Sequence, residues 1–370
     1  MFGGFSVGRE TKLHRMMEKE KIKSFSKPVR YQRIEWIDAL RGILIILMVY
    51  GHNIQFGSGE AVYRNQLYFE NVVFQFIYSF HMPCLMIISG YLLSCSIEKK
   101  RFWRRKLKSL LVPILIWSII PIGIDFMRAV VKKNVRGKSI FISALTTLIS
   151  YYWFLWAILF CTVVIWVIYK FFDDNAMLKV AIGIIFMLLP ELLNVRLWLF
   201  SYPYFTVGYI WGGRKNLCIN KFEQRKSIIA LVLLSAFLVL FQFYNRESFI
   251  YTTGISVRSV SQLQIVLYRL CIGFVGSATI TLIVYNIWRN ENVRHHWLSR
   301  LLIFIGRNSI LIYLVDSLIN SYILIHLSKG YGINYIIAVV ETVFILAICY
   351  YIERLMSKFP NIRAVLLGSR

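Results

Sequence analysis

The chain has 370 residues, of which 58% are hydrophobic, and its formal net charge is +25. Its mean hydropathy is +0.60, whereas soluble domains contain about 45–50% apolar residues and are rarely so hydropathic. These values exclude an ordinary soluble enzyme. Nucleic-acid binding is a poor explanation of the charge, because the basic residues sit in short joints between apolar blocks.

The apolar residues form blocks of about 18–25 residues, the length that crosses a bilayer core of about 30 Å. This pattern predicts an all-α fold, a polytopic transmembrane helix bundle of about ten spans. The fifth and sixth spans are short and are interrupted at Pro190 and at residues 191–196, so they are either half-helices or a bent pair. The predicted spans cover residues 37–55, 71–94, 109–127, 150–171, 177–193, 197–213, 227–244, 265–288, 301–327 and 333–355.

Basic residues in the joints are distributed unequally between the two sides that these spans define, with 30 on one side and 10 on the other. Because Lys and Arg in short loops stay in the cytoplasm, we expect both termini to be cytoplasmic in a multi-pass protein of the cytoplasmic (inner) membrane. Residues 1–34 are expected to form a basic N-terminal tail that lacks the apolar core of a signal peptide. Residues 35–356 then form the transmembrane domain and residues 357–370 a cytoplasmic C-terminal tail.

Ionisable residues inside the spans are the informative ones, because burying them in lipid costs about 3 kcal/mol or more without a partner. Arg41 and His52 in the first span are eleven residues apart. That spacing is three helical turns plus about 20°, so both lie on one face, about 16 Å apart along the axis, with Ile45 and Met48 between them. The bland alternatives are an Arg41 that reaches the interface beside Asp38 and a His52 that bonds a backbone carbonyl.

The second span carries His81 in the stretch Phe-His-Met-Pro, two residues before Pro83. From its depth in the span, we expect His81 to face His52. The alternative is a packing helix that is kinked at Pro83 and holds a hydrogen-bonded histidine.

A basic cluster precedes the third span and consists of Arg101, Arg104, Arg105 and Lys108. On a helical run these spacings place the four side chains on one side, where guanidinium groups suit phosphates such as those of CoA. Ordinary positive charge in a cytoplasmic loop explains the cluster as well, and composition alone favours that explanation.

Other polar residues in the spans are weaker candidates. Glu191, Asp316 and Glu341 are expected either to face a cavity or to pair with one of the arginines Arg196, Arg269 and Arg307. The six cysteines are scattered without metal-ligand spacing, so we expect neither a disulfide framework nor a metal site.

Residues 34–113 resemble the membrane-bound acyltransferase-3 family, and most closely its branch described as fucose 4-O-acetylase-like. The family marker of Arg, ten residues and His is matched by Arg41 and His52. Residues 80–83 and 89–91 match the Phe-His-Met-Pro and Ser-Gly-Tyr stretches of the branch. Weaker similarity continues at residues 152–156 and 305–313.

Two further comparisons with the family leave questions open. Its Arg-x-x-Arg marker is matched literally by Arg101 and Arg104, whereas Arg105 and Lys108 stand nearer the usual distance from the following proline. Members of the family often have a His in a late span, where this sequence has Asp316.

The resemblance implies transfer of an acyl group from cytoplasmic acetyl-CoA, or another acyl-CoA, to a hydroxyl of a surface polysaccharide, an exopolysaccharide or a lipid-linked sugar. It makes His52, Arg41 and His81 the catalytic candidates. His52 is expected to act as the base or to carry the acyl group, and Arg41 to bind a CoA phosphate or to stabilise the thioester oxygen. The acyl-CoA-binding candidates are Arg41, Arg101, Arg104, Arg105 and Lys108. Expected partners are acyl-CoA, the carbohydrate and membrane lipid, with polysaccharide-assembly proteins as further candidates, and neither nucleic acid nor metal.

The rival hypothesis is a proton-coupled transporter or an exporter of a lipid-linked sugar, in which His52, His81 and Asp316 carry protons. Interrupted fifth and sixth spans are typical of some transporters. Against this hypothesis, the two halves of the sequence show no repeat, and the basic cluster has no clear purpose in transport.

Overall fold

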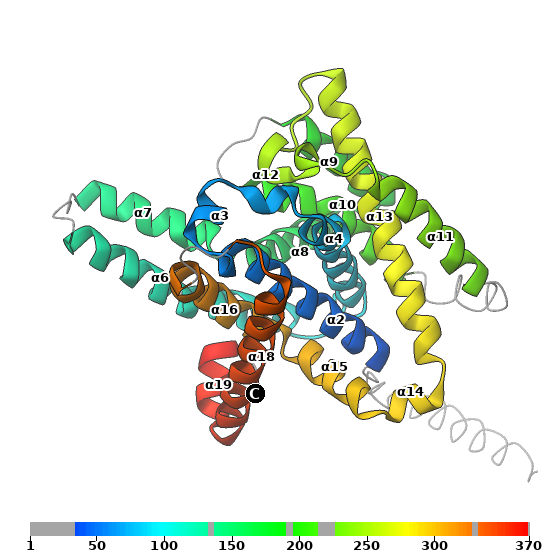
Figure 1. Cartoon of the computed structure of the whole chain (residues 1–370). Helices are drawn as coiled ribbons and strands as arrows, with labels where there is room; N and C mark the ends of the chain where they lie inside the picture. Colours follow the sequence, from blue (N-terminus) through cyan, green and yellow to red (C-terminus); the bar gives the residue numbers. More distant parts are fainter. Residues whose placement is uncertain (1–33, 132–136, 190–194, 214–225, 328–331, 369–370) are drawn as a thin grey trace, which may run out of the picture. The chain divides into compact units, whose positions relative to one another are not determined.

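The computed structural model describes residues 34–131, 137–189, 195–213, 226–327 and 332–368 (Figure 1). Within these ranges the regular structure is helical and contains no strand, which confirms the all-α fold class. The predicted N-terminal tail up to residue 33 lies outside the described residues, as do Glu191 and Cys218.

The helices follow one another with short joints. In chain order they are α2 (Glu35–His52), α3 (Glu60–Arg64), α4 (Val72–Ser94), α5 (Phe102–Lys106), α6 (Val112–Val131), α7 (Gly137–Ser150), α8 (Trp153–Phe171), α9 (Ala176–Leu188), α10 (Arg196–Gly213), α11 (Lys226–Phe241), α12 (Ile250–Thr253), α13 (Val260–Trp288), α14 (Glu291–His295), α15 (Trp297–Arg307), α16 (Ser309–Ile319), α17 (Ile325–Leu327), α18 (Tyr335–Lys358) and α19 (Pro360–Leu367). Three π-helical turns continue α2, α5 and α16, namely η1 (Asn53–Gly57), η3 (Leu107–Leu111) and η7 (Asn320–Leu324), and two 3₁₀ turns are η2 (Leu67–Glu70) and η6 (Arg246–Ser248).

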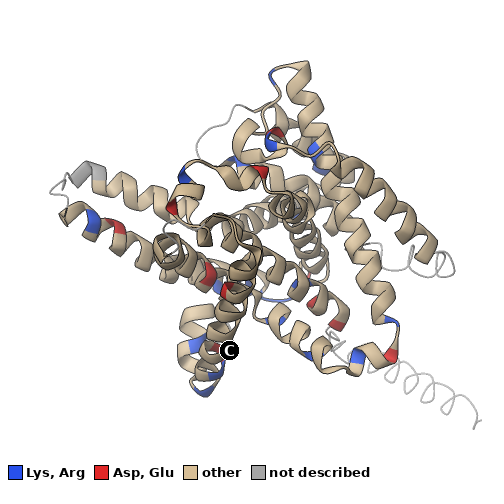
Figure 2. Ribbon diagram, in the orientation of Figure 1, with Lys and Arg blue, Asp and Glu red and all other residues tan. Residues whose placement is uncertain are grey.

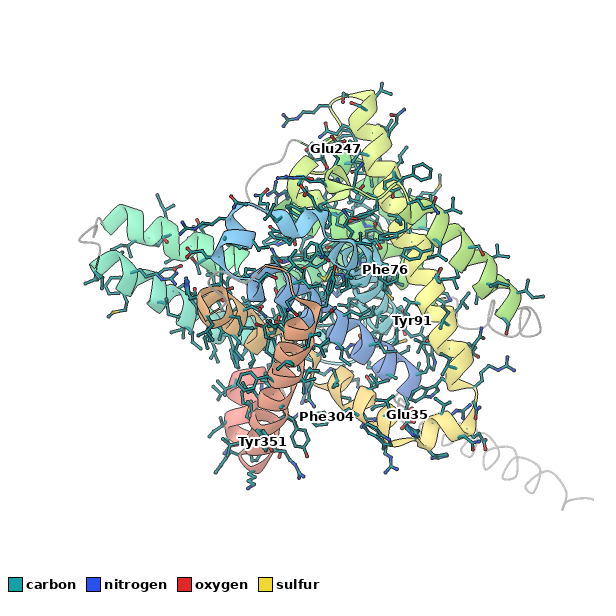
Figure 3. The ribbon with its side chains drawn as sticks, in the orientation of Figure 1. Glu35, Phe76, Tyr91, Glu247, Phe304 and Tyr351 are labelled. Atoms are coloured by element: carbon teal, nitrogen blue, oxygen red, sulfur yellow. The ribbon has the colours of Figure 1, made fainter. Side chains whose placement is uncertain are left out.

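Seven helices in the described ranges are long and apolar enough to cross a membrane, as the sequence predicted for a membrane protein. Large apolar side chains on several of them face outward; Val131 on α6 is 78% exposed and Ile336 on α18 is 77% exposed. Side chains such as Tyr351 on α18 project away from the bundle (Figure 3). A surface of this kind suits lipid, because soluble proteins rarely expose large contiguous apolar patches. The seven helices are Glu35–Gly57, Val72–Ser94, Phe102–Val131, Trp153–Phe171, Val260–Trp288, Ser309–Leu327 and Tyr335–Lys358.

One predicted span differs in the structure. The ninth span, predicted at residues 301–327, is divided at Asn308 into α15 and α16, because Asn308 leaves helical geometry; Arg307, just before the break, forms an ion pair with Asp38. Most of α7 lies in the joint between the third and fourth predicted spans, where it packs against α6 (Figure 1).

Helices α4 and α10 approach each other closely because glycines face backbone at their crossing. A Cβ atom at Gly90 would collide with the carbonyl of Phe205, and one at Gly208 would collide with the carbonyl of Ile87. Small residues allow this approach between membrane helices. Helix α10 is accordingly an inner helix, and its Tyr204 and Phe205 are fully buried.

Charged side chains gather near helix ends and in the joints, and few lie along the middles of the long helices (Figure 2). The middles of α2 and α16 are exceptions of interest, since α2 carries Arg41 and α16 carries the fully buried Asp316. The next section concerns the contacts of these residues.

Candidate active site

A histidine–aspartate pair joins α2 to α16. His52 is the last residue of α2, and its Nδ1 lies 2.6 Å from Oδ2 of Asp316. The Asp316 side chain is fully buried, whereas that of His52 is 19% exposed. Asn320 donates a hydrogen bond of 2.8 Å from Nδ2 to the other carboxylate oxygen, Oδ1. An ionised carboxylate in this position accepts the proton of the ring at Nδ1, an arrangement that leaves Nε2 as the basic nitrogen.

π-Helical turns follow both members of this pair. η1 begins directly after His52, and η7 begins at Asn320. Asn53, the first residue of η1, donates a 2.9 Å hydrogen bond to Thr342 of α18, which ties the end of α2 to a third helix. Such turns are frequent at functional sites.

The pairing of Asp316 differs from the sequence expectation that it would face a cavity or pair with an arginine. Arg307 binds Asp38 instead, at 3.2 Å. Arg269 is buried and donates to backbone carbonyls of the residues before α13, among them Gly254 at 2.6 Å. Among these side chains, Asp316 pairs with the imidazole of His52 and with neither Arg307 nor Arg269.

Arg41 lies about three turns before His52 on α2 and also contacts α16. Its guanidinium donates a 2.5 Å hydrogen bond to the Ser309 hydroxyl and lies 3.8 Å from the Asp38 carboxylate. α2 and α15 touch backbone to backbone beside this point, since a Cβ atom at Gly42 or Gly306 would collide with main-chain atoms of the other helix. We call the region around Arg41 and Ser309 the Arg41 end of the bundle. We call the region around His52 and Asp316 the His52 end.

The contacts between α2 and α16 confirm that Arg41 and His52 share a face. Arg41 meets the start of α16 and His52 meets its later part, so the two helices run in the same direction. Ser309, Asp316 and Asn320 are seven and four residues apart, which places all three within about 20° of one line along α16. This polar line within an apolar helix was the sequence signal that could have identified Asp316 and its partners.

A cavity of about 170 Å³ opens at the Arg41 end. Arg41, Lys106 and Ser309 supply polar groups to its wall, together with Ser89 and Ser109. The remaining wall is apolar, formed by side chains of α2, α4, η3, α8 and α16 such as Ile45, Leu85, Leu110, Phe154, Leu155 and Ile158. The cavity reaches Tyr313, which stands one helical turn before Asp316.

The basic cluster that the sequence singled out is placed mainly on the surface. Arg101 has left-handed backbone geometry (φ 60°) and precedes α5, so it does not share a helical face with the other three residues. Arg104, Arg105 and Lys108 are exposed. Lys106, which was not among the predicted ligands, is the member of this stretch that lines the cavity.

His81 has different surroundings from His52. It is 1% exposed, its Nδ1 donates to the backbone carbonyl of Ile77 at 2.8 Å, and its ring lies edge-on to Tyr78 with 4.7 Å between centroids. This hydrogen bond satisfies one ring nitrogen of the buried side chain within its own helix. The described hydrogen bonds of His81 do not include His52 or Asp316.

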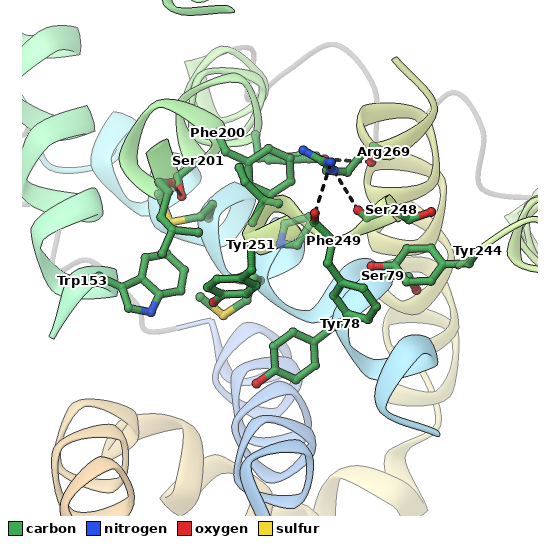
Figure 4. A pocket seen from close by; sticks show the side chains of 16 residues that line it. Tyr78, Ser79, Trp153, Phe200, Ser201, Tyr244, Ser248, Phe249, Tyr251 and Arg269 are labelled. Carbon is green, nitrogen blue, oxygen red and sulfur yellow. Dashed lines mark hydrogen bonds between the residues drawn. The ribbon is translucent and has the colours of Figure 1, made fainter. Parts of the chain in front are cut away.

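An aromatic pocket lies at the His52 end (Figure 4). Its rings come from α4, α8, α10 and the segment between α11 and α13, and Tyr78 connects it to α2, since a Cβ atom at Gly51 would lie 3.0 Å from that ring. Arg269 stacks over Phe200 at 5.8 Å and holds the carbonyl of Ser248 at 2.8 Å, which fixes the segment over the pocket. The labelled rings are Tyr78, Trp153, Phe200, Tyr244, Phe249 and Tyr251.

The comparisons with known proteins identify the family of the chain. The family model described as acyltransferase domain, of the acyltransferase-3 family, matches residues 34–354. This chain therefore belongs to the acyltransferase-3 family and is a membrane acyltransferase, which confirms the family resemblance seen in the sequence.

Two curated proteins illustrate the similarity. The chain is 28% identical over 293 residues to the nodulation protein NolL of Sinorhizobium fredii (strain NBRC 101917 / NGR234), covering 75% of this chain and 76% of that protein. It is 26% identical over 288 residues to the nodulation protein NolL of Mesorhizobium japonicum (strain LMG 29417 / CECT 9101 / MAFF 303099), covering 75% and 74%. No solved structure matches the chain significantly.

Proposed function

We propose that this membrane acyltransferase moves an acyl group, usually acetyl, from acyl-CoA to a hydroxyl of a surface polysaccharide, an exopolysaccharide or a lipid-linked sugar. The observation that carries the proposal is the His52–Asp316 pair, in which a buried carboxylate 2.6 Å from Nδ1 orients an imidazole inside a membrane bundle. Membership of the acyltransferase family favours this reaction over proton-coupled transport.

In the proposed reaction Nε2 of His52 accepts the proton of the sugar hydroxyl while the hydroxyl oxygen attacks the thioester carbonyl. The carbon–sulfur bond breaks, an ester forms, and the proton passes from the imidazolium to the departing CoA thiolate. Asp316 stabilises the imidazolium that exists between these two transfers, as the carboxylate of a catalytic triad does. Nε2 is also the atom that would carry the acyl group in a relay mechanism.

We place the acyl donor at the Arg41 end. Arg41 and Lys106 line the cavity there and are suited to the phosphates or polar arm of CoA. Arg41 and His52 are about 16 Å apart along α2, so one molecule can meet both only if it is extended, and CoA separates its phosphates from its thioester by a long arm. Met48, on the same face of α2 and 2% exposed, occupies the turn between the cavity and His52, and its flexible side chain suits a position that the arm must pass.

We place the acceptor at the His52 end, in the aromatic pocket. Its lining contains many rings, several hydroxyls and one charged side chain, Arg269, which donates to backbone carbonyls. This composition suits an uncharged sugar that stacks on rings. With both termini in the cytoplasm, as the distribution of basic residues favours, the Arg41 end faces the cytoplasm, where acyl-CoA is found, and the acceptor enters from the other side of the cytoplasmic membrane.

A labelled-donor assay tests the proposed function. Membranes that contain the protein are incubated with radiolabelled acetyl-CoA and with glycan from cells that lack it. We expect label to move into the glycan, and the mass of the glycan to rise by one acetyl group per site. Label that remains in CoA or free acetate, while the glycan only changes its side of the membrane, would support the transporter instead.

A kinetic comparison tests the placement of the two substrates. Lys106→Met is expected to raise the KM for acetyl-CoA by about tenfold, because one charge-assisted contact is lost, and to leave the KM for the glycan unchanged. Tyr251→Ala is expected to raise the KM for the glycan by about two- to tenfold, the usual worth of one ring contact, and to leave the KM for acetyl-CoA unchanged. Each variant serves as the control for the other. If either variant changed the KM for acetyl-CoA and the KM for the glycan equally, the placement of the two substrates would be wrong.

A further inference from the structure

An apolar groove runs along the outside of the Arg41 end, separate from the cavity that Arg41 and Lys106 line. Its volume is about 490 Å³, which falls within the ~300–1,000 Å³ range of small-molecule sites. The walls are formed by α2, the end of α13, and α15, through the side chains of Ala39, Ile43, Val284, Ile287, Leu298 and Leu302. None of these six side chains is polar, so the occupant of the groove must be apolar along most of its length.

The mouth of the groove is polar and basic. Asn292 and His296 of the joint between α13 and α15 line it. Around them Arg289, Arg294 and Arg300 are exposed, against the exposed acidic residues Glu291 and Glu35, the latter one helical turn before Ala39 on α2. Arg294 also donates from Nε to the carbonyl of Trp288 at 2.7 Å, which holds its guanidinium beside the groove. An occupant with an anionic head at this end would be favoured, since each Lys or Arg near a membrane surface attracts anionic headgroups.

Helix α15 has the composition of a helix that lies in a membrane interface. Trp297 and Leu298 are 64% and 46% exposed, and Arg300 is exposed beside them. Amphipathic helices with Trp and Leu on one face and Arg on the other lie at the boundary between headgroups and acyl chains. At that depth the surrounding apolar molecules with anionic heads are phospholipids.

We propose that this groove is a specific binding site for an anionic phospholipid, with an acyl chain between α2 and α13 and the headgroup at Arg294 and Arg300. This lipid site does not depend on the proposed reaction. The groove nevertheless adjoins the candidate active site, because Ala39 and Ile43 in the groove wall stand next to Asp38 and Arg41 in the sequence of α2. Occupancy would therefore support the backbone contact between α2 and α15 at Gly42, beside the Arg41 end.

The test uses purified full-length protein in detergent, titrated with phosphatidylglycerol or with phosphatidylcholine, and native mass spectrometry to measure bound lipid. We expect one phosphatidylglycerol to bind at least about tenfold more tightly than phosphatidylcholine, as two or more arginines at the headgroup imply. Ile43→Trp, which fills the groove, is expected to abolish this tight binding. Ile336→Trp, on the exposed face of α18, is the matched control and should bind like the unchanged protein.

A second variant keeps the proposal testable if Ile43→Trp does not fold. Arg294→Gln combined with Arg300→Gln changes two exposed side chains. This double variant is expected to lose the preference for phosphatidylglycerol but still to bind a lipid acyl chain in the groove. Equal binding of the two lipids by the unchanged protein, an unaltered preference in the arginine variant, or normal tight binding by a folded Ile43→Trp protein would each overturn the proposal.

Discussion

Replacing His52 with glutamine is expected to reduce acyl transfer to the background rate, a loss of about 10³-fold or more. Glutamine keeps a polar side chain of similar reach that can still hydrogen-bond Asp316, but it cannot accept a proton at neutral pH or hold an acyl group. The initial rate of label transfer from acetyl-CoA to glycan measures the effect, and the amount of protein in the membrane is measured alongside.

His81→Gln is the matched control for this experiment. Its amide can still donate to the carbonyl of Ile77, the bond that His81 makes at 2.8 Å, so we expect the rate to stay within about tenfold of normal, because only packing is disturbed. If the His81 variant were inactive while present at normal amounts, the sequence-based assignment of His81 as catalytic would be supported. If the His52 variant remained active, the proposed reaction would be wrong.

The choice between a base and an acyl carrier at His52 needs a different readout, since both use Nε2. Rapid mixing of the protein with labelled acetyl-CoA, in the absence of glycan, would show labelled protein if the imidazole carries the acyl group. A direct attack by the sugar oxygen leaves the protein unlabelled under the same conditions. The measurement separates the two mechanisms without altering any residue.

The sequence predicted the fold class and the shared face of Arg41 and His52 for a physical reason. Both follow from local periodicity, that is, from the length of apolar runs and from the 100° step of a helix. The structure confirms the shared face through the contacts of Arg41 with Ser309 and of His52 with Asp316. What local periodicity cannot supply is the identity of those partners, which lie 268 and 264 residues away in the chain.

The other differences have the same origin. At the break at Asn308, Arg307 forms an ion pair with Asp38, a residue 269 positions away in the chain, which local sequence cannot reveal. Lys106 lines the cavity while Arg104 and Arg105 face outward, and this depends on how α5 and η3 pack against the other helices. A run of basic residues in one short joint gives no indication of which of them turns inward.

Asp316→Asn is expected to lower kcat by about 10³-fold while the fold and the KM for acetyl-CoA stay close to normal. Asn320 presents its amide Nδ2 to Oδ1 of residue 316 at 2.8 Å, so the amide oxygen of the new side chain takes that place. Its NH₂ group then faces Nδ1 of His52, which must accept rather than donate. The ring proton is therefore moved to Nε2, and the basic nitrogen is lost to the reaction.

Asp125→Asn provides the matched control, because Asp125 is also a carboxylate on a long apolar helix and accepts a 3.0 Å hydrogen bond from Thr147, away from His52. Its variant should transfer acetyl at the normal rate. Asn320→Ala should have an intermediate effect of about tenfold, since it removes one hydrogen bond from the carboxylate but keeps its charge. An Asp316→Asn protein with normal kcat would show that the carboxylate only packs the helices, whereas a loss confined to KM would move its role to substrate binding. The order of the three rates, Asp125 variant above Asn320 variant above Asp316 variant, follows from a single cause, the proton that the carboxylate holds on Nδ1.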